Sequence, residues 1–183
     1  MRCGLLVKAG ALPYERATIF TTTLSAEYLR NMTMHPDPRL AVLADLQAIE
    51  EIVRQAYSPY IPRIGRPPGP MLDDYEVLIG EGRVYVVELE GAVQGIVVLI
   101  PEQDAMLLDN VAVAPAAKGT GLGRSLLEFA ERSARVAGCR VIRLYTHESM
   151  TENIALYSRI GYTETHRAEE KGLKRVFMVK HLA

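Results

Sequence analysis

The spacing of apolar residues predicts two amphipathic helices. In the first, apolar side chains recur three and four residues apart after Asp45, a favourable N-terminal cap: Leu46, Ile49, Ile52, Val53 and Ala56. In the second, which ends at Gly138, apolar and small residues form a wide stripe: Leu126, Leu127, Phe129, Ala130, Ser133, Ala134, Val136 and Ala137. Each helix therefore has one face suited to packing on a sheet.

The remaining apolar runs are typical of strands. Runs rich in β-branched residues, joined by short turns, predict an antiparallel meander over residues 84–90, 93–100 and 105–115. We expect further strands at 39–43, 139–147, 162–166 and 175–180, with a turn at 169–174 and short helices at 71–79 and 150–160. Pro59 is expected to end the first helix and the proline-rich stretch 61–71 to be a loop. The order of elements predicts an α/β domain with a mixed sheet.

The first 36 residues show no sustained hydrophobic period. Lys8 interrupts the apolar stretch that a signal peptide would need. We therefore predict a poorly ordered N-terminal extension over residues 1–36 and a single domain over 37–183.

Composition narrows the class of protein. The 183 residues carry 21 Lys and Arg against 22 Asp and Glu, a net charge of −1, which argues against nucleic-acid binding driven by bulk charge. Two cysteines, Cys3 and Cys139, are too few for a disulfide framework and are not spaced as a metal site, so a cytoplasmic location is expected. No apolar run approaches the ~20 residues of a membrane helix. We expect no metal, nucleic-acid or membrane partner.

A glycine-rich junction carries the clearest chemical signal. The strand that ends near Val113 runs through Gly119, Gly121 and Gly123 directly into the second helix. Amides at a helix N-terminus bind anions, and Lys118 and Arg124 add positive charge there. The plain alternative is a tight turn that needs glycine. The spacing matches neither the P-loop nor the dinucleotide-binding fingerprint.

Two motifs resemble the GNAT superfamily of N-acetyltransferases. Val113, Pro115, Lys118, Gly121 and Gly123 resemble its V-x-P-x-x-[QR]-x-x-G-x-[GA] motif, with Lys where Gln or Arg is usual. The segment 153–162, NIALYSRIGY, resembles its N-x-A-x-Y-x-x-x-G-[FY] motif. The expected order of elements also agrees from about residue 39 to the C-terminus, so the first 35 or so residues lie outside the resemblance.

The resemblance implies a fold and a cofactor site. The fold is a mixed, mostly antiparallel sheet flanked by helices and splayed between its fourth and fifth strands. The co-substrate is an acyl-CoA, most often acetyl-CoA. Its pyrophosphate is expected on Lys118, Gly119, Thr120, Gly121, Leu122, Gly123 and Arg124, and its pantetheine along Val111, Ala112 and Val113 with Asn153.

The resemblance also implies transfer of the acetyl group to a primary amine by direct attack in a ternary complex. Tyr157 is the expected general acid for the departing thiolate. A small-molecule amine is the expected acceptor, a protein amine is not excluded, and GNAT enzymes are often homodimers. Two other classes remain open: an acyl-CoA-binding sensor without turnover, and a nucleotide-binding domain of another kind.

The general base is left open by the sequence. We expect Asp109, beside the strand expected to bind the cofactor, to be the base. Glu102, His147, Glu148 or a water relay are alternatives. Tyr57, Tyr60 and Met71 are candidates for lining the acceptor pocket.

Overall fold

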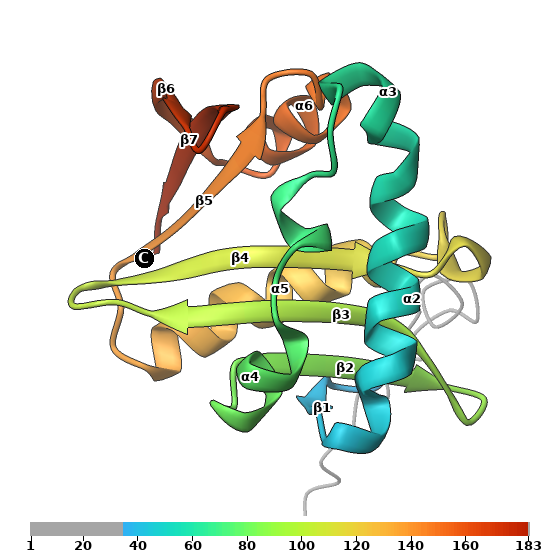
Figure 1. Ribbon diagram of the computed structural model, residues 1–183. Coiled ribbons are helices and arrows are strands. Elements are labelled where there is room, and N and C mark those ends of the chain that lie inside the picture. The colour runs from blue at the N-terminus through green and yellow to red at the C-terminus, as the bar shows by residue number, and fades with distance from the viewer. Residues whose placement is uncertain (1–34, 183) are drawn as a thin grey trace, which may run out of the picture. The chain divides into compact units, whose positions relative to one another are not determined.

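The computed structural model describes residues 35–182, which contain a seven-stranded sheet in the order β1-β2-β3-β4-β5-β7-β6 (Figure 1). The strands are β1 (Arg39–Leu40), β2 (Val84–Leu89), β3 (Ala92–Pro101), β4 (Ala105–Val113), β5 (Val141–His147), β6 (Thr163–Glu170) and β7 (Leu173–His181). The helices are α2 (Leu46–Tyr57), α3 (Ile61–Ile64), α4 (Tyr75–Gly80), α5 (Leu122–Val136) and α6 (Thr151–Arg159). Four 3-10 turns, η1 (Leu43–Asp45), η2 (Ser58–Tyr60), η3 (Gly69–Met71) and η4 (Pro115–Ala117), complete the described elements.

Helices cover both faces of the sheet, and each face has its own apolar core. On one face, α5 buries Leu122, Leu126 and Leu127 against β3, β4 and β5, and α6 packs at the same core. On the other face, α2 buries Ile49, Ile52 and Val53, as their spacing predicts, and α4 packs beside it. The predicted fold class, a mixed and mostly antiparallel sheet flanked by helices, is confirmed.

The sheet opens between its fourth and fifth strands. β4 and β5 are the parallel pair, and they are matched only over Ala105–Leu107 and Val141–Arg143. Beyond these three residue pairs β4 stays with β3 and β5 stays with β7, so the two halves of the sheet diverge (Figure 1). The predicted splay is therefore present, and it leaves one edge of β4 open from Leu108 onward.

A β-bulge lies at the start of this opening. Val98 is matched with Asn110 and Leu99 with Leu108, so Asp109 has no partner on β3. Before the bulge Leu108 packs in the core under α5, and after it Ala112 packs in the core under α2. A single inserted residue therefore reverses which face the alternate side chains reach.

The segment after α2 differs from the prediction. Helical turns continue through η2 and α3 to Ile64, where a loop was expected from residue 61. Pro59 and Pro62 stand at the first positions of these turns, where a backbone N–H has no helical partner to lose. Gly65, with φ of 82°, ends α3 in the left-handed conformation.

Two helix starts and the length of one apolar stripe also differ. The Asp45 carboxylate does not cap α2, because it accepts hydrogen bonds from Arg39 and from the Val42 amide. The helix expected from residue 71 begins only at Tyr75, where the Asp74 side chain caps it through the Val77 amide. Val136 is 90% exposed, so the apolar stripe of α5 stops about one turn earlier than predicted.

The final hairpin is longer than predicted. β6 and β7 extend to Glu170 and Leu173, which leaves a turn of two residues in place of the expected turn over 169–174. Lys171 and Gly172 both have positive φ, 51° and 71°, as a type I′ turn requires.

The predicted N-terminal extension, residues 1–36, lies almost wholly outside the described residues 35–182 and stays a prediction. In the described part, no helix has both the length and the apolar character needed to cross a membrane.

Candidate active site

The open edge of β4 presents backbone hydrogen-bonding groups. The Ala114 amide donates to the Gln94 carbonyl of β3 at 2.8 Å. Because backbone groups alternate sides along a strand, the Ala112 amide also faces β3, whereas the amides of Val111 and Val113 face the opening. Of the three residues predicted to bind a pantetheine, Val111 and Val113 therefore have amides free to pair with a ligand.

A glycine loop joins this edge to α5. Gly119 and Gly121 have φ of 80° and 91°, a left-handed conformation that favours glycine. A Cβ built on Gly119 would meet nothing within 4 Å, so glycine is needed there for the backbone conformation rather than for space. The Thr120 hydroxyl donates to the Ala117 carbonyl at 2.8 Å and holds the loop in place.

The first turn of α5 begins at this loop. Leu122 is completely buried, so its side chain anchors the helix, and its amide donates to the Thr120 hydroxyl oxygen at 3.4 Å. The first amides of a helix lack intrahelical partners and carry its positive dipole end. The predicted cradle, residues 118–124, is thus a run of backbone beside the open strand edge.

A groove runs from the glycine loop along β4 to α6. Lys118, Gly123 and Arg124 line it at the loop, Val111, Ala112 and Val113 along the strand, and Asn153 and Tyr157 on α6. Arg124 is largely exposed and pairs with Glu128 at 2.9 Å. Basic groups and helix amides at one end, followed by an unpaired strand edge, fit a long molecule with phosphates at one end and amide groups along its length. The residues present therefore fit coenzyme A.

A second hollow, the splay cleft, opens between the diverging halves of the sheet. The space between its walls, including solvent at its open mouth, amounts to about 610 Å³. Its walls come from seven elements: α2, α3, η3, β4, β5, α6 and β7. The residues that line it are Tyr57, Ile64, Pro68, Gly69, Pro70, Leu108, Asp109, Asn110, Val111, Leu144, Tyr145, Thr146, His147, Met150, Asn153, Tyr157, Leu173 and Arg175. Val111, Asn153 and Tyr157 line both the groove and the cleft. The two hollows therefore meet at these residues.

Tyr157 lies at this junction with a free hydroxyl. Its ring packs edge-on against Tyr162, with centroids 5.7 Å apart. Among residues 35–182 its hydroxyl has no hydrogen-bond partner. Burial raises the pKa of Tyr157 to about 12, so the phenol keeps its proton at neutral pH. The side chain can therefore donate a proton to a ligand at the junction.

Asp109 and Tyr145 form a polar pair inside the cleft. The Tyr145 hydroxyl donates to Asp109 Oδ1 at 2.6 Å across the splay. The Arg175 guanidinium lies 4.0 Å from the centroid of the Tyr145 ring and also pairs with Glu170 at 2.8 Å. Burial and the neighbouring Asp109 charge raise the pKa of Tyr145. The bulge thus brings Asp109 into the cleft, as its predicted role requires.

A buried network fixes the opposite wall. Tyr57 donates to Asn110 Oδ1 at 2.6 Å, and Asn110 Nδ2 donates to the Tyr75 hydroxyl at 2.8 Å. Tyr75 in turn donates to the Pro70 carbonyl at 2.9 Å. The network joins α2, η3 and α4 to β4. Tyr57 lines the cleft as predicted, whereas Tyr60 and Met71 do not.

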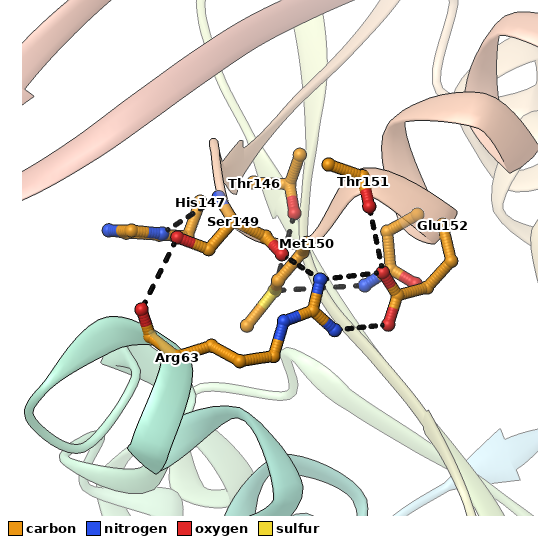
Figure 2. Close-up of polar contacts among 8 residues, drawn as sticks. Arg63, Thr146, His147, Ser149, Met150, Thr151 and Glu152 are labelled. Carbon is orange, nitrogen blue, oxygen red and sulfur yellow. Dashed lines mark hydrogen bonds and ion pairs between the residues drawn. The ribbon is translucent and has the colours of Figure 1, made fainter.

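The α3 segment is bonded to the turn between β5 and α6 (Figure 2). The Arg63 guanidinium binds Glu152 at 2.7 Å and also donates to the Ser149 carbonyl, and the Ser149 hydroxyl donates back to the Arg63 carbonyl at 3.5 Å. Arg66 donates to the Lys171 carbonyl at 3.0 Å and so reaches the β6–β7 turn. These contacts hold the proline-rich segment against both turns at the cleft.

The structure separates the candidate bases. Asp109 and His147 line the cleft, whereas Glu102 and Glu148 do not. Glu102 pairs with Arg143, and Glu148 pairs with Lys174 at 3.4 Å. His147 Nδ1 accepts from the Ser149 amide at 3.1 Å, and burial lowers the pKa of this imidazole.

Four residues of the site, Asn110, Tyr145, Arg175 and Arg63, were not among the residues predicted from the sequence. Asn110 interrupts an apolar strand as a buried polar residue, which was a usable signal. Tyr145 and Arg175 stand in expected strands, and nothing in the sequence brings them together.

Comparisons with known proteins agree with this geometry. Residues 80–164 match the model of the acetyltransferase (GNAT) domain. The chain is 33% identical over 136 residues to the uncharacterized N-acetyltransferase YjgM of Escherichia coli, covering 69% of this chain and 81% of that protein.

Solved structures agree as well. The ribosomal-protein-S18-alanine N-acetyltransferase of Escherichia coli has a TM-score of 0.65 at 21% identity, covering 80% of this chain and 93% of that one. YncA, a putative acetyltransferase of Salmonella typhimurium determined with its cofactor acetyl-CoA, has a TM-score of 0.61 at 25% identity over the same shares.

These findings confirm the predicted family. At the level of that family they also confirm that the protein is an acyltransferase with acetyl-CoA as co-substrate. A nucleotide-binding domain of another kind, one of the open alternatives, is thereby set aside. The chain belongs to the GNAT superfamily of N-acetyltransferases.

Proposed function

We propose that this protein transfers the acetyl group of acetyl-CoA to a primary amine while both substrates are bound. The observation that carries the proposal is the meeting of two hollows at Val111, Asn153 and Tyr157. The groove fits the donor, and the cleft on the other side of the same residues leaves room for the acceptor.

The groove would hold the donor mainly through backbone. Within residues 118–124, the amides of Lys118 and Thr120 donate to the Pro115 and Ala117 carbonyls. The remaining amides of this run, with the Lys118 and Arg124 charges, would bind the pyrophosphate. Val111 and Val113 would pair with the pantetheine amides as a neighbouring strand does, Ala112 would add a wall contact, and Asn153 would bind near the thioester. Acetyl-CoA supplies an acyl group already activated as a thioester.

The transfer exchanges one bond for another and moves two protons. The acceptor nitrogen bonds to the carbonyl carbon as the carbon–sulfur bond breaks, giving an N-acetyl amine and free CoA thiol. Asp109 would take the proton that the amine loses, directly or through water, and Tyr157 would give its proton to the departing sulfur. The Val111 amide would polarise the carbonyl oxygen.

Direct attack is supported by the residues that surround the junction. Among the described lining residues of both hollows there is no Cys or Ser, and the hydroxyl of Thr146 donates to the sulfur of Met150. Cys139, the free cysteine of the described part, lies outside both linings. Holding both reactants at one junction would supply much of the rate enhancement.

The enclosed cleft favours a small-molecule amine over a folded protein as acceptor, because the α3–η3 segment forms one of its walls. The domain limits of 37–183, a cytoplasmic location and a homodimer stay predictions.

Thiol release with acetyl-CoA and a panel of primary amines tests the proposal against the sensor alternative. Acetyl-CoA at about 100 times its Kd should stabilise the protein by about 2.7 kcal/mol in thermal unfolding. We expect thiol release that depends on an amine, with the N-acetyl product identified by mass spectrometry. Stabilisation by acetyl-CoA without acetylation of any amine would instead identify a sensor.

A further inference from the structure

We infer that the acceptor is an amino acid with an apolar side chain, bound through its amine at Asp109 and through its carboxylate at Arg175. This inference rests on the proposed function, because it names the substrate class of the same cleft.

The charges within the cleft are few and of opposite sign. Among its described lining residues, Asp109 carries the one carboxylate and Arg175 the one guanidinium. His147 also lines the cleft, but burial lowers the pKa of its imidazole and so favours the neutral form. An amine without a second charged group would leave the guanidinium unused by the ligand, whereas a zwitterion matches both charges.

Tyr145 contacts both of these groups. Its hydroxyl donates to Asp109, and the Arg175 guanidinium stacks on the face of its ring. One side chain therefore contacts both the carboxylate and the guanidinium. Opposite charges beside a single side chain suit a ligand whose amine and carboxylate are separated by one carbon atom, with a hydrogen bond at each end.

Arg175 retains hydrogen-bonding capacity for a ligand. Its side chain is only 16% exposed, and one terminal nitrogen binds Glu170. A guanidinium has five N–H donors in a planar fork, which suits bidentate binding of a carboxylate. A purely structural pair would not need a largely buried arginine, since Arg167 and Glu164 form an exposed pair on the same hairpin.

The rest of the cleft lining combines apolar side chains with polar ones such as Asn110, Thr146 and Asn153. Ile64, Pro68, Leu108, Leu144 and Leu173 line it from α3, its following loop, β4, β5 and β7. These side chains can pack against an aliphatic or aromatic side chain, but they offer no partner for a second charge.

The test compares matched acceptors with the wild-type enzyme. Each of L-leucine, L-methionine and L-phenylalanine is assayed beside its amide and its decarboxylated amine, by acetyl-CoA-dependent thiol release. We expect kcat/KM for the amino acid to exceed that for both analogues by about tenfold or more, the equivalent of about 1.4 kcal/mol. The amide has the more easily deprotonated amine, so this preference could not come from nucleophile ionisation.

Two variants then assign the carboxylate to Arg175. Arg175→Gln should raise KM for the amino acids about tenfold and leave kcat/KM for the decarboxylated amines within about threefold. Arg175→Lys should give a KM for the amino acids between those of the wild type and Arg175→Gln, because lysine keeps the charge but lacks the planar fork of N–H donors. Glu170→Gln removes the ion pair but keeps the guanidinium, so it should not weaken amino-acid binding. Stabilisation by acetyl-CoA checks that each variant is folded.

The outcomes are distinct. Equal use of amino acids and decarboxylated amines by the wild type would overturn the inference and leave the proposed function intact. Equal losses in Arg175→Gln and Glu170→Gln would also overturn it, since the arginine would then serve only the ion pair. Stabilisation by acetyl-CoA with no acetylation of any amine would overturn the proposed function and the inference together.

Discussion

The two hollows that meet at Tyr157 are built in different ways. The donor groove consists mainly of backbone: an open strand edge, a left-handed glycine loop and the first turn of α5. The splay cleft, proposed for the acceptor, consists of side chains from seven elements between α2 and β7, fixed by hydrogen bonds such as those of Asn110 and Tyr145. A backbone site suits a donor that does not vary, whereas a side-chain site can be changed by substitution without altering the fold.

Tyr157 belongs to both hollows, so its substitution should have the largest effect. Tyr157→Phe removes the proposed proton donor and should lower kcat about 100-fold, with Kd for acetyl-CoA within about threefold. Steady-state kinetics and titration calorimetry measure the two constants. Tyr162→Phe is the matched control, because the Tyr162 hydroxyl is buried without a partner in the described structure and lines neither hollow. Unchanged turnover in Tyr157→Phe would remove this residue from the mechanism.

Asp109→Asn tests the acceptor side alone. The amide keeps an oxygen for the Tyr145 hydroxyl but cannot accept the amine proton, so kcat/KM for the amine should fall about 30-fold. The binding of acetyl-CoA should stay unchanged. Glu148→Gln, whose carboxylate lies outside the cleft lining, is the control. Full activity in Asp109→Asn would transfer the role of base to His147 or to water.

Gly121→Val tests the donor side alone. The left-handed φ of 91° is strained for a β-branched residue, and the new side chain would crowd the phosphate path, so Kd for acetyl-CoA should rise about tenfold or more. Gly138→Val imposes the same kind of strain at φ of 78°, beyond the far end of α5. Calorimetry should show weakened binding in the first variant and normal binding in the second. Normal binding in both would mean that the cradle is misplaced.

The smallest effect is expected at Asp73, which lies outside the cleft lining. Burial and, after it, the Asp109 charge raise the pKa of Asp73 from 3.8 to about 6, so folding favours its neutral form. Its ionisation therefore destabilises the protein as pH rises between these two values. Asp73→Asn should match the wild type below about pH 4 and exceed its Tm by about 1 °C above pH 6, because solvent screening weakens the effect. Thermal unfolding across this range measures the difference. A difference that is largest at low pH would contradict the assignment.

The contrast between the hollows also explains what the sequence could predict. The groove depends on glycine spacing and on residues next to one another in the chain, and the motifs around Gly121 and Tyr157 carry that information. The cleft depends on long-range pairs such as Tyr145 with Asp109 and Tyr57 with Asn110, separated by 36 and 53 residues. Asp109 was predicted from its place on the strand, but the bulge that turns it into the cleft leaves no mark in the sequence.

The helical continuation through Pro59 and Pro62 shows the same limit on a smaller scale. Proline stops a helix in its interior and starts one at its first turn, and the sequence alone does not separate the two cases. The contacts of Arg63 with Glu152 and Ser149 then hold this segment in place, through partners more than 80 residues away.

Initial velocities measured with acetyl-CoA and an amine varied together test the central claim most directly, because two hollows that meet at one junction require both substrates to be bound at once. The account predicts reciprocal plots that converge and an enzyme whose intact mass is unchanged after incubation with acetyl-CoA alone. Parallel plots, together with an enzyme that becomes acetylated in the absence of amine, would contradict it.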